Sequence, residues 1–141
     1  HKMIAGDAII QTLMICDSNL VRQFMTRLVD LGVPAKVHSL AGVGPLKSSP
    51  MARFLNERIL GSVIREELLK RMDGVVQGIS EDDKEARRDG WRAEGQNICI
   101  EQIEELREMA GVSGVHIMAI EWEAAIRPIT ERAGLLPRPI V

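Results

Sequence analysis

The sequence reads AIIQTLMI at residues 8–15, a short segment that is almost continuously apolar. Such a pattern is typical of a strand that is buried on both faces of a parallel sheet. A helical pattern follows at once, because Asp17 or Ser18 offers a cap and apolar residues recur at helical spacing from 20 to 29. Gly32 then ends this helix. A buried strand followed by an amphipathic helix predicts an α/β fold.

Two further strand–helix units are predicted downstream. Residues 36–41 and 115–120 read as the second and third strands. Pro50 suits the first position of a helix capped by Ser49. The remaining helices are expected over about residues 65–72, from the acidic segment 80–83 to Met109, and from the third strand to Ala133, where Gly134 stops the chain's last helix.

Two of these helices have a predicted inward face. The helix at Pro50 should turn Met51, Phe54 and Leu55 toward the core. The long helix should bury the following side chains: Trp91, Ile98, Cys99, Ile103 and Leu106. Gly90 and Gly95 lower the helix propensity of its first half.

The alternation of strands and helices predicts parallel strands joined by right-handed crossovers. The length of 141 residues fits one domain. Three strands cannot close a barrel, and a (β/α) barrel usually needs about 250 residues. The chain is therefore expected to be either a small open α/β sheet or the last part of something larger.

Composition excludes several classes of function. The net charge of −2, with both signs interspersed, and the aromatic content of 3% argue against a nucleic-acid partner. We expect no membrane association, because no apolar stretch is long enough to span a bilayer. We expect the protein to be located in the cytoplasm, because no signal-peptide pattern opens the sequence. Cys16 and Cys99 lack metal-ligand spacing and read as buried reduced thiols; the three histidines are also scattered, so no metal is predicted.

Three motifs carry a resemblance to a known family. The first is KMIAG at residues 2–6, running into Gln11-Thr12 and up to Asp17; the second is LAGVGPLKS at residues 40–48, followed by MARF. The third is GVHIMAIEWE at residues 114–123, ending in ERAGLLP. In their order and spacing these motifs resemble the methylenetetrahydrofolate reductase family, and the third is similar to the form found in acetogenic bacteria.

The resemblance implies a TIM (β/α)8 barrel that carries FAD and reduces 5,10-methylenetetrahydrofolate to 5-methyltetrahydrofolate. Residues 1–141 would form a single segment with the last three strand–helix units of that barrel, incomplete as an isolated chain. The family's catalytic glutamate and most of its flavin contacts lie upstream of these units. Whether the chain is an enzyme by itself therefore stays open.

The expected partners follow from the same resemblance. They are the folate substrate once the barrel is complete, a homo-oligomer or a partner that supplies the rest of the barrel, and an electron-transfer subunit of the kind found with acetogenic members. The alternative is a non-catalytic α/β fragment that self-associates or completes a partner barrel. A third hypothesis is a small-molecule-binding fragment that uses the loop at residues 42–49.

Three candidate residues lie in the first motif. Lys2 stands where the family has a lysine facing the flavin phosphates; the alternative is an exposed lysine in a frayed terminus. Leu13 stands where the family usually has a glutamine that contacts the pterin, and leucine cannot form those hydrogen bonds. Gln11 shares the same face of the strand, so it either substitutes for that glutamine or is an interior polar group of the barrel.

The other two motifs give further candidates, each with a structural alternative. Phe54 lies near the position of an aromatic that stacks on the folate's aminobenzoyl ring, or it is a core residue. Glu121, with Glu123, either does acid–base or substrate-binding work or stabilises a helix start. The loop at residues 42–49, with Lys47 and Ser48, is either an anion site or a plain turn.

Overall fold

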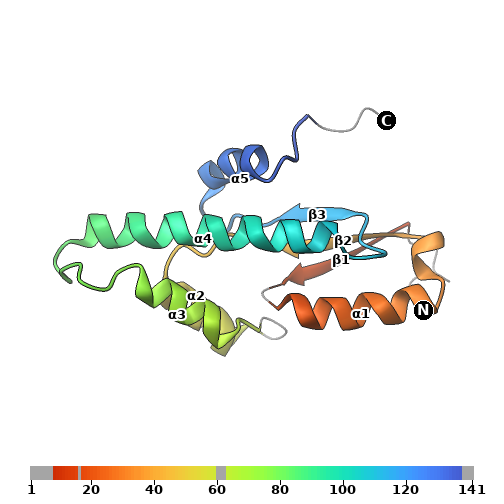
Figure 1. Ribbon diagram of the computed structural model, residues 1–141, viewed down its shortest axis with the longest axis horizontal. Helices are drawn as coiled ribbons and strands as arrows, with labels where there is room; N and C mark the ends of the chain where they lie inside the picture. Colours follow the sequence, from red (N-terminus) through yellow and green to blue (C-terminus); the bar gives the residue numbers. More distant parts are fainter. Residues whose placement is uncertain (1–7, 16, 60–62, 138–141) are drawn as a thin grey trace.

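The computed structural model describes residues 8–15, 17–59 and 63–137. In this part of the chain, three parallel strands form one sheet in the order β1 (Ile9–Met14), β2 (His38–Val43) and β3 (Gly114–Ile117) (Figure 1). The predicted α/β class with parallel strands is therefore confirmed. The third strand is shorter than predicted: Met118 still donates to the carbonyl of Val43 at 2.7 Å, and the chain then turns away.

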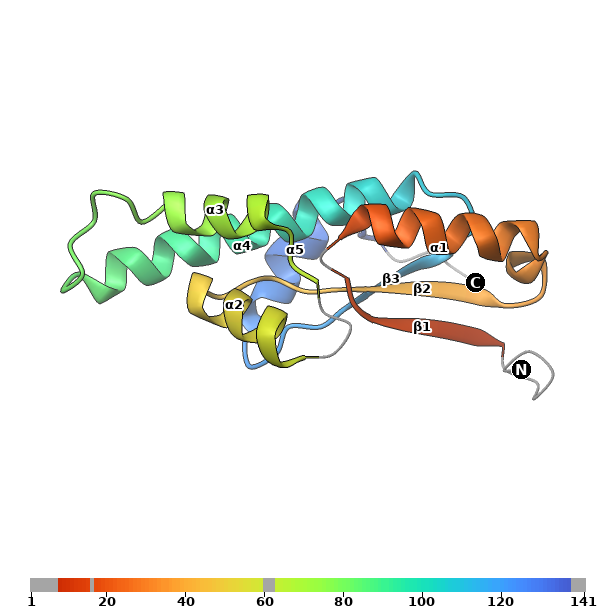
Figure 2. The same cartoon turned by 90° about the horizontal axis from the view of Figure 1, so that it is seen from below.

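Helices connect and cover these strands. Their bounds are α1 (Ser18–Asp30), α2 (Ser49–Arg58), α3 (Glu66–Gly74), α4 (Lys84–Arg107) and α5 (Ile126–Arg132), with 3-10 turns η2 (Val33–Ala35) and η3 (Glu123–Ala125). Figure 2 shows α1 and α4 on the same side of the strands. In Figure 1, α5 lies beside α4 on the side away from α1. Together, α1, α4 and α5 thus form a layer over one face of the sheet.

The helix caps follow the sequence closely, with one shift. Asp17 caps α1, as one of the two predicted alternatives, and its carboxylate accepts from the backbone of Asn19 at 2.9 Å. The cap of α2 is Ser48, which accepts from Met51 N at 3.2 Å, so the prediction of Ser49 as cap was wrong by one residue. Ser49 instead donates its hydroxyl proton to Asp73 of α3.

The covered face of the sheet builds the main core. Ala41 and Val43 of β2 point into it and are 3% and 0% exposed. They pack with residues of α1, α4 and α5: Val21, Met25, Cys99, Ile103, Leu106 and Ile129. Burial of this apolar surface is the main force that holds the helix layer to the sheet.

A second core fixes α2 and α3 against the first half of α4, and it explains Gly95. A Cβ at Gly95 would lie 1.8 Å from the carbonyl oxygen of Leu46, so only glycine lets α4 approach this loop. The expected weakening of the helix does not interrupt it, because α4 runs unbroken through Gly90 and Gly95. Close packing on Leu46 outweighs the low helix propensity of glycine here.

One packing prediction was wrong. Phe54 is 56% exposed, whereas Leu55 beside it is 6% exposed and lies in the second core, as predicted. α2 buries the side of the helix that carries Ala52 and Leu55, and Phe54 lies off that side. The reading of Phe54 as a core residue is therefore corrected.

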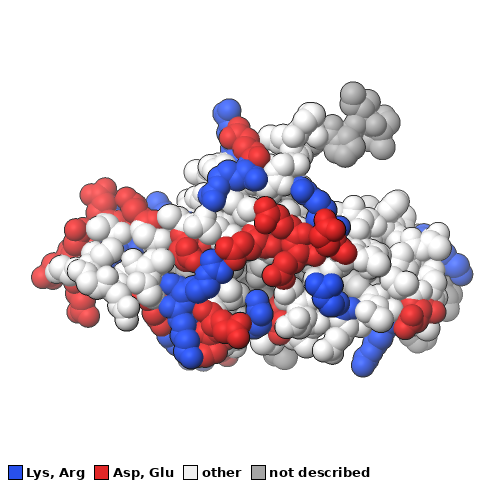
Figure 3. Space-filling view, viewed as in Figure 1, with Lys and Arg blue, Asp and Glu red and all other residues white. Residues whose placement is uncertain are grey.

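Charged side chains cover the outer surface of α4. Figure 3 shows acidic side chains gathered along this helix. Glu101, Glu104 and Glu105 of α4 are exposed. Arg71 of α3 joins them through ion pairs of 2.6 Å to Glu94 and to Glu101. These contacts raise the pKa of Arg71 and, through the hydrogen bond from Arg71, lower that of Glu101. The network ties α3 to α4.

No helix in residues 8–15, 17–59 and 63–137 is both long and apolar enough to cross a membrane.

Candidate functional site

The sheet has an open face, opposite α1 and α4. It carries the side chains of Ile9, Gln11, Leu13, His38, Leu40 and His116. Strand alternation and pairing place Ile9, Gln11, His38, Leu40 and His116 there, because the neighbouring residues Ala41 and Val43 point into the core. Leu13 follows a shift in the pairing of β1 with β2 and is assigned to this face by its exposure. Ile9 is 56% and Leu13 66% exposed, so large apolar side chains stand on this face without cover.

A hydrogen bond crosses the open face between its outer strands. The amide Nε2 of Gln11 in β1 lies 2.7 Å from Nδ1 of His116 in β3. Gly42 of the middle strand lies level with His116 and has no side chain to separate the two. An amide nitrogen only donates, so Nδ1 accepts and a neutral ring carries its proton on Nε2.

The strand β1 is irregular near its carboxyl end. The pairing with β2 shifts between Gln11 and Met14, and the hydroxyl of Thr12 accepts from the backbone N–H of Gly42 at 2.9 Å. This side-chain bond replaces a rung of the ladder, as at a β-bulge. Beyond it, Met14 is buried at 7% exposure while Leu13 stays on the open face.

An ion pair lies at the carboxyl ends of β2 and β3, which we call the rim. In (β/α) barrels, ligands bind at this end of the strands. Lys47 Nζ lies 3.2 Å from Glu121 Oε2, and the two side chains are 24% and 84% exposed. Glu121 has a φ of 52°, a left-handed conformation that costs energy for a residue other than glycine. Glu123 is the first residue of η3, which runs into α5 at Ile126, so the helix-start alternative fits Glu123. Glu121 lies before this turn, and the helix-dipole alternative does not explain it.

The loop at residues 42–49 uses its polar groups internally. Lys47 pairs with Glu121, and Ser48 caps α2. Ser49 donates to Asp73, and Arg53 also pairs with that carboxylate; these bonds hold the pKa of Asp73 below its ordinary value. This pattern favours the plain strand-to-helix turn over an anion site.

The structure brings some of the candidate residues together and separates others. Gln11 and Leu13 share the open face, and Glu121 lies at the rim, where the carboxyl ends of the strands are. Phe54 is on the exposed side of α2, and Lys2 lies outside the described residues. His116 is the residue that sequence reasoning missed, although its place in the third predicted strand was a signal, since Val115 and Ile117 on either side of it are apolar.

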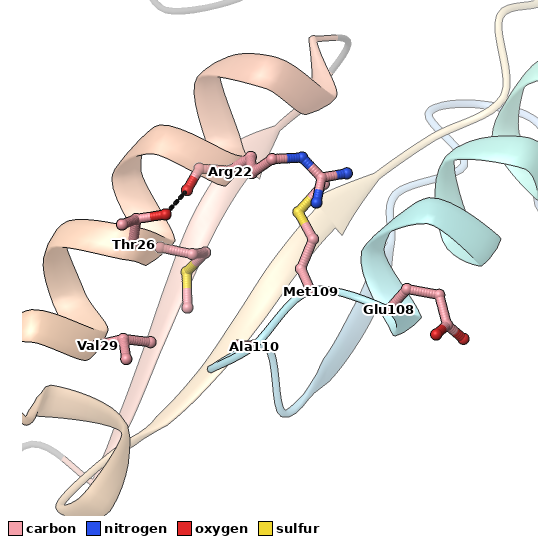
Figure 4. A pocket seen from close by; sticks show the side chains of 7 residues that line it. Arg22, Thr26, Val29, Glu108, Met109 and Ala110 are labelled. Carbon is pink, nitrogen blue, oxygen red and sulfur yellow. Dashed lines mark hydrogen bonds between the residues drawn. The ribbon is translucent and has the colours of Figure 1, made fainter.

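A separate groove lies in the helix layer, between α1 and the end of α4 (Figure 4). It has a volume of about 410 Å³ and is lined mainly by Met25, Val29 and Met109. Arg22 reaches over it, whereas Glu108 points away from it. The groove is on the side of the sheet opposite Gln11 and His116, and it brings together no group of residues suited to acid–base work.

Within the described ranges, no group of three or more histidine, cysteine, aspartate or glutamate residues is arranged to hold a metal ion.

A family model described as "Methylenetetrahydrofolate reductase" matches residues 1–134. This range covers nearly the whole sequence, including the open face and the rim. A search of curated proteins found no match.

Proposed function

The chain belongs to the methylenetetrahydrofolate reductase family, and we propose that residues 1–141 form the last three strand–helix units of a TIM (β/α)8 barrel. The open face carries this proposal. Parallel sheets are covered on both faces, whereas Ile9 and Leu13 stand uncovered on this one. Further strand–helix units, from the same polypeptide or another chain, would turn the open face into a barrel interior.

The proposed activity is an FAD-dependent reduction of 5,10-methylenetetrahydrofolate to 5-methyltetrahydrofolate, of the acetogenic type. The reduced flavin supplies the hydride when it is bound. The family's catalytic glutamate lies in the units before this segment, so the chain contributes to the site without completing it. An electron-transfer subunit is the further partner that this type of reductase implies.

The described residues fit part of a flavin or folate site. Gln11 and His116 offer hydrogen-bonding groups on the open face, and Leu13 beside them offers an apolar contact. This combination suits a flat ring with polar atoms on its edge. Leu13 leaves one hydrogen bond to the pterin unmade, which at this position weakens folate binding by about 1–2 kcal/mol.

The rim has a defined role in this proposal. Lys47 donates to Oε2 of Glu121, so the other carboxylate oxygen can accept from a donor on the substrate while the ion pair stays in place. The ion pair is exposed and therefore weak, worth about 0–1 kcal/mol, so it also leaves Glu121 able to adjust to the substrate. Lys47 and Glu121 thus bind and orient; neither is assigned a proton transfer.

The absorption spectrum of the protein tests the proposal. The isolated chain should bind no stoichiometric FAD and show no turnover. Co-expression with the amino-terminal strand–helix units of a family member should give a yellow, flavin-bound protein that reduces methylenetetrahydrofolate. A complex that assembles but stays colourless in excess FAD would contradict the proposed function.

A second candidate function is a non-catalytic fragment that self-associates or completes a partner barrel. The outer side of α1 favours it, because Leu20 and Phe24 lie one helical turn apart and are 51% and 45% exposed. These side chains flank the edge strand β1, which can pair with another strand. Under this reading, the co-expressed complex would form with no flavin.

A further inference from the structure

We propose that Gln11 is a positioning residue for His116, and that the Nε2–H group of His116 donates a hydrogen bond to a ring acceptor of the ligand on the open face. The inference rests on the proposed function and deepens it. It assigns a hydrogen bond to the ligand on the open face, with His116 as the donor. His116 lies 105 positions along the sequence from Gln11, the residue that positions it.

The meeting of the two side chains depends on Gly42. A Cβ at this position would lie 2.5 Å from Cε of Met118 and 2.6 Å from the carbonyl oxygen of Leu13. Any side chain there would displace these neighbours and stand between Gln11 and His116. The glycine therefore allows a 2.7 Å hydrogen bond to form directly over the middle strand.

The hydrogen bond fixes which nitrogen of His116 is available. Since Gln11 donates to Nδ1, the proton of the neutral ring is on Nε2. Among the described residues, Nε2 has no hydrogen-bond partner, and His116 is exposed. Once further units cover the open face, this N–H group needs an acceptor, because a buried donor without one is costly.

The surroundings indicate what supplies that acceptor. The side chain of Met118 brings apolar surface to the region around Gly42, next to the polar pair, and Leu13 exposes a further apolar side chain on β1. Apolar contact with a single directed donor suits the edge of a fused heteroaromatic ring, through a carbonyl oxygen or a ring nitrogen. Flavin and pterin rings share this chemistry, so the experiment must distinguish them.

Nitrogen NMR of the histidine rings in the full chain tests the positioning role without any ligand. His116 should show the Nε2–H tautomer. Gln11→Leu should release it to a mixture of tautomers, and Gln11→Glu should move the proton to Nδ1, because a carboxylate only accepts. His38 is the matched control: it lies on the same face at the other end of the sheet, and neither variant should change it.

The outcome that overturns the positioning role is clear. An Nδ1–H tautomer in the wild-type chain would do so, as would a His116 spectrum that Gln11→Leu leaves unchanged. Gln11 and His116 are both exposed, so these variants should keep the fold, which the backbone spectrum verifies.

Titration with millimolar FAD or 5-methyltetrahydrofolate then tests the ligand contact. The ligand that binds should shift Nε2 of His116 but not that of His38, and the responding compound identifies the ring. His116→Phe should weaken this binding by about tenfold, the scale of one hydrogen bond, and His116→Gln, which keeps an N–H group, should weaken it less.

Two negative results remain distinguishable. Shifts at the Leu13 methyl groups with His116 unmoved would overturn the inference and leave the proposed function standing. Absence of any shift with either compound would overturn the ligand contact alone, because the proposed function is tested by the flavin content and turnover of the co-expressed complex.

Discussion

The two faces of the sheet differ in how they are covered. On the face toward α1 and α4, Ala41 and Val43 are 3% and 0% exposed; on the open face, Ile9 and Leu13 are 56% and 66% exposed. The apolar pattern of β1 nevertheless suits burial on both sides. The difference between the two faces supports the proposal that further strand–helix units would cover the open face, as in a barrel.

Truncation of a leucine on each face should give the largest difference. Leu106→Ala removes a side chain that is 1% exposed in the main core and should lower the free energy of unfolding by about 2–5 kcal/mol. Leu13→Ala on the open face should change it by less than about 0.5 kcal/mol. Urea unfolding followed by circular dichroism, at a concentration low enough for the chain to be monomeric, measures both. Equal losses in the monomer would contradict the difference between the two faces.

Glycine substitutions sharpen the account of the covered side. Gly95→Ala should destabilise by about 1–3 kcal/mol or more, because the new Cβ would meet the Leu46 carbonyl oxygen at 1.8 Å. Gly90→Ala in the same helix should be nearly neutral, since its Cβ would lie 3.3 Å from the Val75 carbonyl and the gain in helix propensity offsets that tight contact. Thermal unfolding of the two variants gives the comparison; a stable Gly95→Ala variant would refute the close approach of α4.

Acid should weaken the helix layer in a defined pH range. The pKa of Asp73 lies below its ordinary value, chiefly through the hydrogen bond from Ser49, so this carboxylate stabilises the fold above about pH 4. That contribution is lost as the pH falls through the lower, folded-state pKa. Asp73→Asn should cost about 1 kcal/mol or less at neutral pH and flatten the acid limb of the stability profile.

Asp82 provides the control for this experiment. Its side chain is exposed and forms no ion pair with another described residue, so Asp82→Asn should leave the acid limb unchanged. Urea midpoints between about pH 7 and pH 3 measure the effect. Identical profiles for Asp73→Asn and the wild type would show that the bonds from Ser49 and Arg53 do not stabilise the fold.

Leu13→Gln should have the smallest effect on stability and a specific effect on binding. At 66% exposure, position 13 tolerates the amide, so stability should change by less than about 0.5 kcal/mol. In a completed barrel, folate affinity should rise by about 1–2 kcal/mol, because the new amide can pair with the pterin. Calorimetry with folate reads the second quantity; loss of stability without a gain in affinity would mark Leu13 as core.

The parts of the fold set by local sequence were predictable. The apolar run of β1, the cap at Asp17 and the acidic start of α4 at Asp83 each depend on neighbours within a few residues. The need for glycine at position 95 could not be predicted from its neighbours, because it comes from the close approach of Leu46, which is far away in sequence. Helical spacing suggested an inward Phe54, but the position of α3 determines which side of α2 is buried.

The site was predictable only in part, for the same reason. Alternation along β1 predicted one face for Gln11 and Leu13, and both are exposed, but the shift in pairing between Gln11 and Met14 was not predicted. The contact between Gln11 and His116 depends on the register of three strands and on Gly42 between them, and no local pattern contains that information.

Sedimentation of the isolated chain over a range of concentrations tests the central claim most directly. An open face and exposed sheet edges should drive association, so the average mass should rise with concentration above that of a 15.7 kDa monomer. A compact monomer at all concentrations, with cooperative unfolding, would show that the sheet needs no further cover and would contradict its place in a barrel.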